Sequence, residues 1–352
     1  MMSYIIVIAA ALATIAAWYK FWRGHAARFV ESGYVPPATS RFGQFGFACF
    51  SYLLTFLTVG KVKVIRKARV PKGRVVFAAN HQLPCDFAML RRGSGRHFRM
   101  LTDSAQLGGF FGVLAACGGV ISVAFKAKTD GARAEQSCVA AVASRHKRIS
   151  FALALLAWVG CAAAFVYAVS IGSTPLALGA AVFALAVAGM PGEAPALGIF
   201  PEGSLLPDNP NLDVMFRPGA VRIARAAGEG CGESVQIVPM AILYKHDAAS
   251  ADWTHRYLSG MRSMFAGMRN PKVWNPIFKL KLDELPEAER EEIERRKKEA
   301  LEAYRKSKIT NYGGVVVVGE PIDPAKLPAD PIEAINEIHK VVAALYEEAR
   351  RH

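Results

Sequence analysis

The chain has 352 residues, of which 52% are hydrophobic, and its positive mean hydropathy is high for a protein that stays in water. Its formal net charge of +14 favours anionic partners; the basic residues lack the aromatic interleaving of nucleic-acid-binding modules, so lipid headgroups or phosphorylated molecules fit better. The six cysteines are scattered without close pairs, which argues against a zinc site or a disulfide framework and suits a reducing compartment.

The first hydrophobic segment spans residues 1–19, which carry no charged side chain. No basic stretch precedes this segment, unlike in a secretory signal, and Lys20 and Arg23 follow it among aromatic residues, as at a membrane interface. A second uncharged stretch, residues 42–60, also ends in a basic cluster. If both stretches crossed the bilayer, one basic cluster would lie outside, against the positive-inside tendency. We therefore expect membrane-anchoring helices in residues 1–62, with one or both lying in the interface.

A polar turn, residues 80–86, connects the apolar run 75–79 to a predicted helix over residues 84–92. Proline is favoured at the first helical position, where Pro84 stands, and the positive end of the helix dipole favours a carboxylate in the first turn. Such a turn can bring the imidazole of His81 to the carboxylate of Asp86, which is the arrangement of a general base. The alternative is that His81 is simply a polar turn residue.

Short strands at residues 98–101 and 118–123 and a helix over residues 132–143 continue an α/β pattern. A hydrophobic insert follows, with uncharged stretches at residues 151–169 and 174–190. At about 1.5 Å per residue, each is long enough to cross a hydrocarbon core of about 30 Å. The basic residues before the insert place that end on the cytoplasmic side, and an even number of crossings returns the chain there. A buried core hairpin is the alternative.

A second polar turn, Glu202-Gly203-Ser204, follows the apolar run 196–199. Polar turns at the carboxyl ends of strands are where open α/β sheets build their sites, so this turn is expected to face His81. A further apolar strand is predicted over residues 235–244. It contains Pro239, which cannot donate to a ladder and therefore predicts a sheet edge or a bulge.

In these three blocks the sequence resembles the 1-acyl-glycerol-3-phosphate (lysophosphatidic acid) acyltransferases and their glycerolipid acyltransferase relatives. The resemblance rests on Asn80-His81-x4-Asp86, on Phe200-Pro201-Glu202-Gly203-Ser204 and on Val238-Pro239. It implies an α/β fold with a mixed sheet flanked by helices, membrane-associated helices at the amino end, and catalysis by His81 and Asp86. The hydrophobic hairpin is a departure from the simplest members of that family.

The resemblance also implies which residues bind the substrate. It gives Glu202 a part in acceptor binding, either by accepting a hydrogen bond from the acceptor hydroxyl or by orienting Arg217; capping of the turn is the alternative. Arg217 is the candidate for a phosphate contact, and Gly203 would let backbone amides approach a phosphate or an oxyanion. Ser204 and Pro239 belong to the matched blocks.

The family usually has a phosphate-binding arginine soon after the strand at residues 118–123. This sequence has no arginine there, and Lys126 or Lys128 is the nearest cation. A lysine supplies a point charge rather than a bidentate fork, so the two residue types are not equivalent at a phosphate site. A solvated loop is an equal alternative for these lysines.

The expected organisation comprises membrane-anchoring helices in 1–62, the first half of the acyltransferase domain in 63–148, a hydrophobic hairpin in 149–191 and the second half in 192–352. Residues 253–274 mix basic and aromatic side chains, which either rest on lipid or pack in the core. Residues 285–308 are predicted as a solvated charged helix.

The expected reaction is direct transfer of a fatty acyl group from acyl-CoA or acyl-carrier protein to a hydroxyl of a lysophospholipid. No metal or bound cofactor is expected, because the thioester is already activated. Membrane lipids are expected partners, with the active site on the cytoplasmic face. Lysophosphatidic acid is the default acceptor; glycerol 3-phosphate, other lysophospholipids or a lyso-aminolipid are alternatives. Two rival interpretations are a nucleophilic Cys85 and a lipid-binding protein without turnover.

Overall fold

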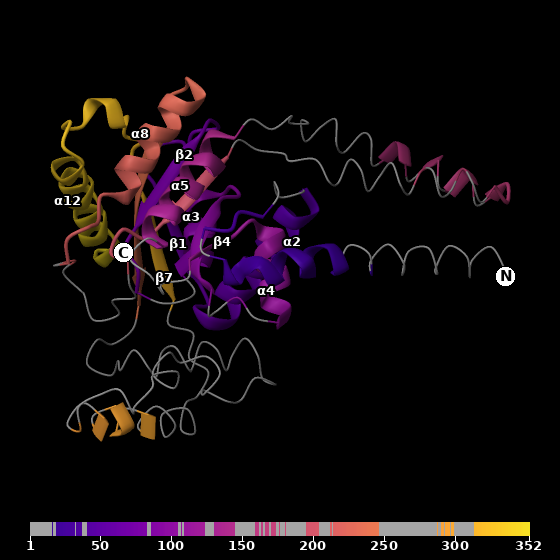
Figure 1. The fold of residues 1–352 in the computed structure, drawn as a ribbon, viewed down its shortest axis with the longest axis horizontal. Helices are drawn as coiled ribbons and strands as arrows, with labels where there is room; N and C mark the ends of the chain where they lie inside the picture. Colours follow the sequence, from indigo (N-terminus) through magenta and orange to yellow (C-terminus); the bar gives the residue numbers. More distant parts are fainter. Residues whose placement is uncertain are drawn as a thin grey trace.

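The computed structural model (Figure 1) describes residues 16, 19–31, 33–36, 41–82, 86–104, 107, 109–123, 130–144, 195–203, 212, 214–245 and 313–352, with short pieces between 159 and 180 and between 287 and 298. Several predictions fall outside these residues and stay predictions. They concern residues 1–15, Pro84, Cys85, Lys126, Lys128, Ser204, residues 253–274, and most of the segments 151–190 and 285–308.

The described residues form a mixed sheet of seven strands in the order β1-β7-β6-β2-β5-β3-β4. The strands are β1 (Val62–Arg66), β2 (Val75–Ala79), β3 (Arg99–Asp103), β4 (Ile121–Val123), β5 (Ala196–Ile199), β6 (Gln236–Tyr244) and β7 (Gly314–Val318). All pairs are parallel except β6 with β7, which is antiparallel. The predicted fold class, a mixed sheet flanked by helices, is therefore confirmed.

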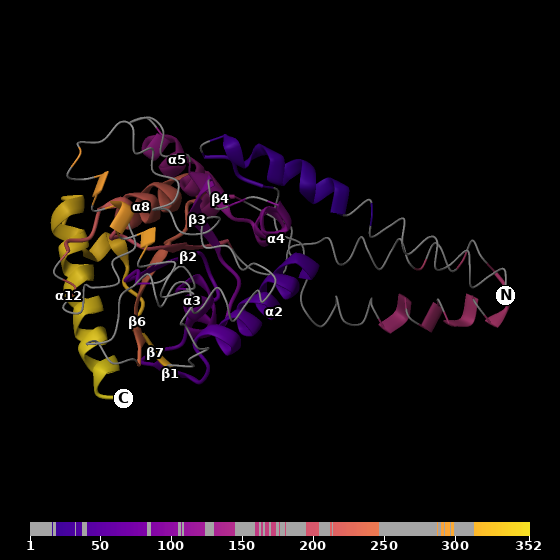
Figure 2. The same ribbon diagram turned by 90° about the horizontal axis from the view of Figure 1, so that it is seen from below.

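Helices cover both faces of this sheet (Figure 2). They are α2 (Arg41–Thr58), α3 (Asp86–Ser94), α4 (Gly109–Gly118), α5 (Asp130–Ala143), α8 (Gly219–Cys231) and α12 (Pro331–Arg350), with short 3-10 turns η1 (Arg28–Val30) and η6 (Pro324–Lys326). Helices α5, α8 and α12 pack on one face, and α3 packs on the other. Strand β2 lies between these two layers of helices, with Val76 and Ala78 pointing to the first face and Phe77 to the second. Because both of its faces are buried, the strand is apolar throughout.

The expectation that Pro239 marks a sheet edge is wrong, because β6 lies inside the sheet between β2 and β7. On the β7 side, Ile237 exchanges backbone hydrogen bonds with Ile322 at 2.8 and 2.7 Å, and the carbonyl of Pro239 accepts one from the N–H of Gly319 at 2.9 Å. Backbone groups two residues apart point the same way along a strand, so the nitrogen of Pro239 also faces this side. The missing donor thus falls beside the irregular segment 319–322, which is how an interior strand accommodates proline.

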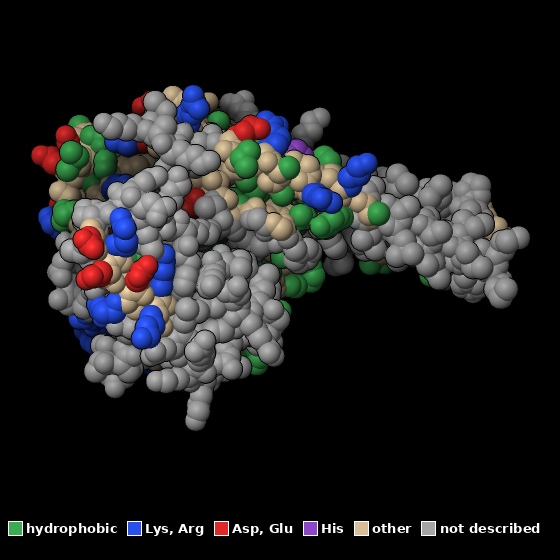
Figure 3. All heavy atoms as spheres, turned by 60° about the horizontal axis from the view of Figure 1, so that its bottom comes forward, with side chains coloured by type: hydrophobic (Ala, Val, Ile, Leu, Met, Phe, Trp, Pro, Cys, Tyr) green, Lys and Arg blue, Asp and Glu red, His purple; other side chains and the backbone are tan. Residues whose placement is uncertain are grey.

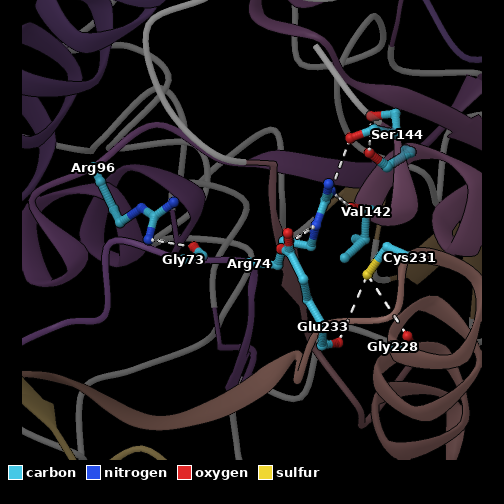
Figure 4. A network of polar contacts seen from close by, with 9 residues as sticks. Gly73, Arg74, Arg96, Val142, Ser144, Gly228, Cys231 and Glu233 are labelled. Carbon is cyan, nitrogen blue, oxygen red and sulfur yellow. Dashed lines mark hydrogen bonds and ion pairs between the residues drawn. The ribbon is translucent and has the colours of Figure 1, made fainter. Parts of the chain in front are cut away.

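A buried arginine ties the amino end of β2 to its neighbours (Figure 4). The guanidinium of Arg74 donates to the carbonyls of Val142 and Ser144 and forms an ion pair with Glu233 at 3.1 Å. Ser144 is the last described residue before the predicted hydrophobic hairpin, and β5 begins at Ala196 just after it. The described residues on either side of that insert, Ser144 and Ala196, therefore lie at the amino edge of the sheet, whereas the two polar turns leave its carboxyl edge.

Helix α2 buries one side and exposes the other. Phe47 and Leu54 pack near α3, while Phe45, Leu53 and Phe56 have exposed fractions of 66%, 55% and 67%. Within the described part of the chain, no helix combines the length and the apolar character needed to cross a bilayer. The anchoring role of residues 1–62 and the crossing of the bilayer by the hairpin stay predictions.

Candidate active site

The imidazole of His81 and the carboxylate of Asp86 are in contact, as the sequence predicts. Strand β2 ends at Ala79, and helix α3 begins at Asp86, which is fully buried. The Nδ1 atom of His81 lies 2.9 Å from Oδ2 of Asp86. A carboxylate accepts, so Nδ1 carries the proton and Nε2 is the basic nitrogen of the ring. The ring of His81 stacks on Phe200 at 4.1 Å between centroids, which fixes its plane.

Asp86 takes further hydrogen bonds from two residues that sequence reasoning did not single out. The backbone N–H of Gln82 donates to Oδ2 at 2.5 Å, and the hydroxyl of Tyr244, at the end of β6, donates to Oδ1. The contact with Gln82 is local and follows from the turn. The contact with Tyr244 joins residues 158 positions apart, so no local pattern could have indicated it.

Asn80 binds the turn to the neighbouring strand. Its side-chain amide donates to the carbonyl of Ile242 at 2.9 Å, and its amide oxygen accepts from the N–H of Ile242 at 2.8 Å. Asn80 is fully buried, so both bonds are shielded from water. The carboxyl end of β2 is thereby held against β6, and His81 starts from a fixed point.

Glu202 joins the second polar turn to the first. Its Oε2 atom accepts a hydrogen bond from the backbone N–H of His81 at 3.0 Å, and its side chain is almost completely buried. Among the described residues, Oε1 of Glu202 has no hydrogen-bond partner. Burial, and to a lesser degree the charge of Asp86, raises the pKa of Glu202 to about 8, although the N–H of His81 lowers it.

Arg217 lies against the glycine of the second turn rather than against its carboxylate. A Cβ placed on Gly203 would lie 2.9 Å from the Cζ and Nε atoms of Arg217. The N–H of Arg217 donates to the carbonyl of Pro201 at 2.8 Å, which fixes the backbone there. Among the described residues, no hydrogen bond or ion pair joins Glu202 to Arg217. The predicted alternative in which Glu202 orients Arg217 therefore has no support from these contacts.

The carboxyl-terminal helix supports the His81 turn from behind. The side-chain amide of Gln82 donates to the hydroxyl of Tyr346, on α12, at 2.8 Å, and both residues are buried. This contact spans 264 positions, and sequence reasoning missed it. The turn that carries His81 is thus attached to α3, β6 and α12 through Asp86, Tyr244 and Tyr346.

A cavity of about 420 Å³ opens beside the two turns. Polar or small groups form one part of its wall, including His81, Gly203 and Arg217. Apolar side chains form another part, from α2, α3, β3 and α4 and the segments beside α4: Phe47, Phe87, Met100, Leu107, Ala115 and Val120. Pro239 is not among the lining residues. The wall also includes Glu135 and Arg222, which form an ion pair at 2.6 Å.

Arranged in this way, the site has a basic nitrogen, a cation and an apolar compartment around one cavity. Within the described part of the chain, no three histidine, cysteine, aspartate or glutamate side chains come together where they could hold a metal ion. Four residues with predicted roles lie outside the described part of the chain, so those roles stay predictions: Lys126, Lys128, Ser204 and Cys85. What the arrangement offers chemically is proton abstraction next to a place for a hydrocarbon chain.

Comparison with known proteins identifies a family model and several similar solved structures. The family model described as Acyltransferase matches residues 61–243, which include both polar turns. The chain is also similar to the crystal structure of the 1-acyl-sn-glycerophosphate (LPA) acyltransferase PlsC from Thermotoga maritima. That match has 15% identity and a TM-score of 0.41, and it covers 87% of this chain and 79% of that one. No protein of curated function matches the chain.

Proposed function

The chain belongs to the acyltransferase family and is an O-acyltransferase, and from this premise we propose that it acylates the free hydroxyl of a lysophospholipid. The proposed acceptor is 1-acyl-glycerol 3-phosphate, which would give phosphatidic acid. The proposed donor is the thioester of acyl-CoA or of acyl-carrier protein. The observation that carries the proposal is the contact of His81 with Asp86, because His81 lines a cavity that is also lined by Arg217.

In the proposed reaction His81 is the general base. Its Nε2 atom takes the proton of the acceptor hydroxyl while that oxygen bonds to the thioester carbonyl carbon, and Asp86 stabilises the imidazolium that forms. The carbon–sulfur bond then breaks, and the leaving thiolate takes the proton back from His81. The products are the new ester and a free thiol, so atoms and charge balance without a cofactor.

The acceptor phosphate is proposed to bind at Arg217 and Gly203. Arg217 offers a guanidinium fork, which suits the geometry of a phosphate group. Gly203 has a positive φ of 73° and no side chain, so a ligand can approach the backbone of the turn closely. Glu202 acts through the backbone of His81, because its carboxylate is turned toward that N–H.

A fatty acyl chain is proposed to occupy the apolar part of the cavity. Aromatic and aliphatic side chains from α2, α3 and α4 line it, and burial of each methylene there contributes about 0.8 kcal/mol. The polar turns would then face the reacting carbonyl and hydroxyl groups. This division between a polar and an apolar wall supports a substrate that has both a charged headgroup and a hydrocarbon tail.

Membrane association on the cytoplasmic face is part of the proposal. The outer side of α2 exposes Phe45, Leu53 and Phe56, and an acceptor with one acyl chain is supplied by a bilayer. Towards the amino end, exposed Lys20 and Arg23 accompany exposed aromatic side chains, and basic and hydrophobic groups lie together on the surface drawn there (Figure 3). Such mixtures suit an interface with anionic lipid.

The test is an acyl-transfer assay with purified membranes that carry the full chain, labelled acyl-CoA and a panel of acceptors, with products identified by mass. We expect label in phosphatidic acid when lysophosphatidic acid is offered. His81→Ala should lower the rate roughly 10²- to 10⁴-fold. His352→Ala, which removes an exposed imidazole that does not line the cavity, is the matched control and should keep the rate.

Each rival has its own outcome in this assay. A labelled product formed from another acceptor of the panel would show that this acceptor, and not lysophosphatidic acid, is the substrate. Loss of activity in Cys85→Ser, with an acyl-thioester trapped on the wild-type chain, would favour the cysteine mechanism. Binding of lysophosphatidic acid that persists in His81→Ala, without release of CoA in either form, would indicate a lipid-binding protein. A normal rate in His81→Ala would overturn the proposed mechanism.

A further inference from the structure

We infer that Tyr244 is a positioning residue for the His81–Asp86 pair. It positions the pair through a hydrogen bond to the carboxylate oxygen of Asp86 that His81 does not use. This inference rests on the proposed function of His81 as general base. Tyr244 lies outside the three sequence blocks on which the resemblance depends. The structure nevertheless connects it directly to the buried acid of the site.

The two oxygens of Asp86 have separate partners. Oδ2 faces Nδ1 of His81 at 2.9 Å and the N–H of Gln82 at 2.5 Å, while Oδ1 accepts from the hydroxyl of Tyr244. With donors on both oxygens, the carboxylate cannot rotate without breaking one of these bonds. The hydroxyl of Tyr244 therefore fixes the direction from which Asp86 holds the imidazole.

The hydroxyl itself is held by the sheet. Tyr244 is the last residue of β6 and is 3% exposed. It pairs with Gly314 of β7, and two residues earlier Ile242 is bound on both backbone groups by Asn80. Since Asn80 directly precedes His81, the same stretch of β6 anchors both the start of the turn and the donor to Asp86. Any shift of β6 would move both.

A buried tyrosine needs some acceptor for its hydroxyl, and a backbone carbonyl would serve for stability alone. Here the acceptor is the carboxylate that orients the proposed base. A hydrogen bond to an anion is charge-assisted, so it holds the carboxylate more firmly than a bond between neutral groups would. With Oδ2 of Asp86 held in this direction, Nδ1 of His81 donates to it, which leaves Nε2 to accept the proton of the substrate.

This predicts a direction for the pH profile. Without the hydroxyl, the carboxylate has one donor fewer and attracts the imidazolium more strongly, so the acid limb of the pH–rate profile should move to higher pH. The titratable and charged groups around the site, among the described residues, include Glu202 after β5, Arg217 before α8 and Tyr346 on α12. All three stay in the variant, so the difference between the two profiles isolates Tyr244.

The experiment compares the full chain with Tyr244→Phe in purified membranes over a range of pH. We expect kcat to fall roughly tenfold, as for loss of one charge-assisted hydrogen bond, with KM for donor and acceptor nearly unchanged. The acid limb of kcat/KM should move to higher pH. Tyr52→Phe, which removes an exposed hydroxyl on α2, is the matched control and should change neither quantity.

A double-mutant cycle with Asp86→Asn separates positioning from packing. If Tyr244 acts through Asp86, Tyr244→Phe should add little to the loss already caused by Asp86→Asn. An unchanged kcat and acid limb, or a full additional loss in the Asp86→Asn background, would overturn the inference. If Tyr244→Phe does not fold, difluorotyrosine at position 244 replaces it: its stronger donor should move the acid limb to lower pH, and an unmoved limb refutes the inference.

The outcome for Tyr244 is distinguishable from that for the function. If His81→Ala is inactive and Tyr244→Phe behaves like the wild type, the proposed function stands and the inference falls. If His81→Ala keeps the normal rate, the function itself has failed.

Discussion

The carboxylate of Glu202 accepts a hydrogen bond from the backbone N–H of His81 at 3.0 Å, so the second polar turn directly holds the first. The two residues are 121 positions apart, and they meet because β2 and β5 are parallel neighbours whose carboxyl ends lie at the same edge of the sheet. The bond gives Oε2 of the buried Glu202 a donor, close to the negative charge of Asp86.

Glu202 should make the stability of the protein depend on pH. Its pKa is raised from 4.5 to about 8 in the folded state, so between these values the folded chain binds a proton that the unfolded chain has lost. As pH rises through that window, the free energy of unfolding should therefore fall by about 1.4 kcal/mol per pH unit, relative to a variant without the acid. Glu202→Gln should gain on the wild type as pH rises from 5 to 8 and no further above 8, as measured by thermal unfolding.

Glu229→Gln is the matched control, because Glu229 is exposed on α8 and should show no such trend. A difference between Glu202→Gln and the wild type that stays constant across the window would contradict the raised pKa of Glu202.

Arg217 should contribute to binding of a phosphorylated acceptor. Arg217→Ala should raise KM for lysophosphatidic acid about 10- to 100-fold, as for loss of a hydrogen-bonded charge, and leave KM for acyl-CoA nearly unchanged. Arg217→Lys should recover part of the loss, because it restores the charge but not the fork. Lys340→Ala removes an exposed charge on α12 as the control. An equal loss for a phosphate-free acceptor would show that Arg217 does not bind phosphate.

Gly203 should tolerate no side chain. A methyl group there would meet the guanidinium of Arg217 at 2.9 Å, and the φ of 73° disfavours other residues by roughly 1–2 kcal/mol. Gly203→Ala should lower the midpoint of thermal unfolding and weaken acceptor binding in the same direction as Arg217→Ala. Gly230→Ala, where the nearest atom to an added Cβ is 3.7 Å away, is the control and should not weaken binding. The prediction fails if Gly203→Ala binds the acceptor as the wild type does.

Ala115 should limit the length of the bound acyl chain. It lines the apolar part of the cavity and is 2% exposed, so a larger side chain there takes space from the ligand. Ala115→Leu should shift the preferred acyl-CoA to shorter chains, with about 0.8 kcal/mol lost for each methylene that no longer fits. Rates over a series of acyl-CoA donors measure this shift. Val341→Leu, at an exposed position on α12, should leave the series unchanged. An unaltered preference in Ala115→Leu would contradict acyl binding in this part of the cavity.

The local parts of the site were accessible from the sequence. An apolar run followed by a polar turn predicted β2 and β5 correctly, and proline and aspartate near a helix start led to the contact of His81 with Asp86. These arguments need only neighbouring residues, because a five-residue turn is governed by local sterics and the helix dipole.

The distant parts of the site were not accessible. Tyr244 appeared only as the last residue of a predicted apolar strand, and Tyr346 was not singled out, although each has a hydroxyl that needs a partner. Which partner it finds depends on strand order, and the order places β6 beside β2. The wrong edge alternative for Pro239 has the same origin: its missing donor is harmless only because the chain after β7 is irregular at that level, which agrees with the other predicted alternative, a bulge.

The position of β7 between β1 and β6 also matters during synthesis. The ribosome makes β1 early and β7 more than two hundred residues later, on the order of tens of seconds at ordinary translation speed. Throughout that interval β1 lacks the neighbour that completes its ladder, and one side of β6 lacks it from the time β6 is made. Until β7 emerges, the growing chain therefore exposes open strand edges, and a chaperone that shields them should raise the yield of folded protein.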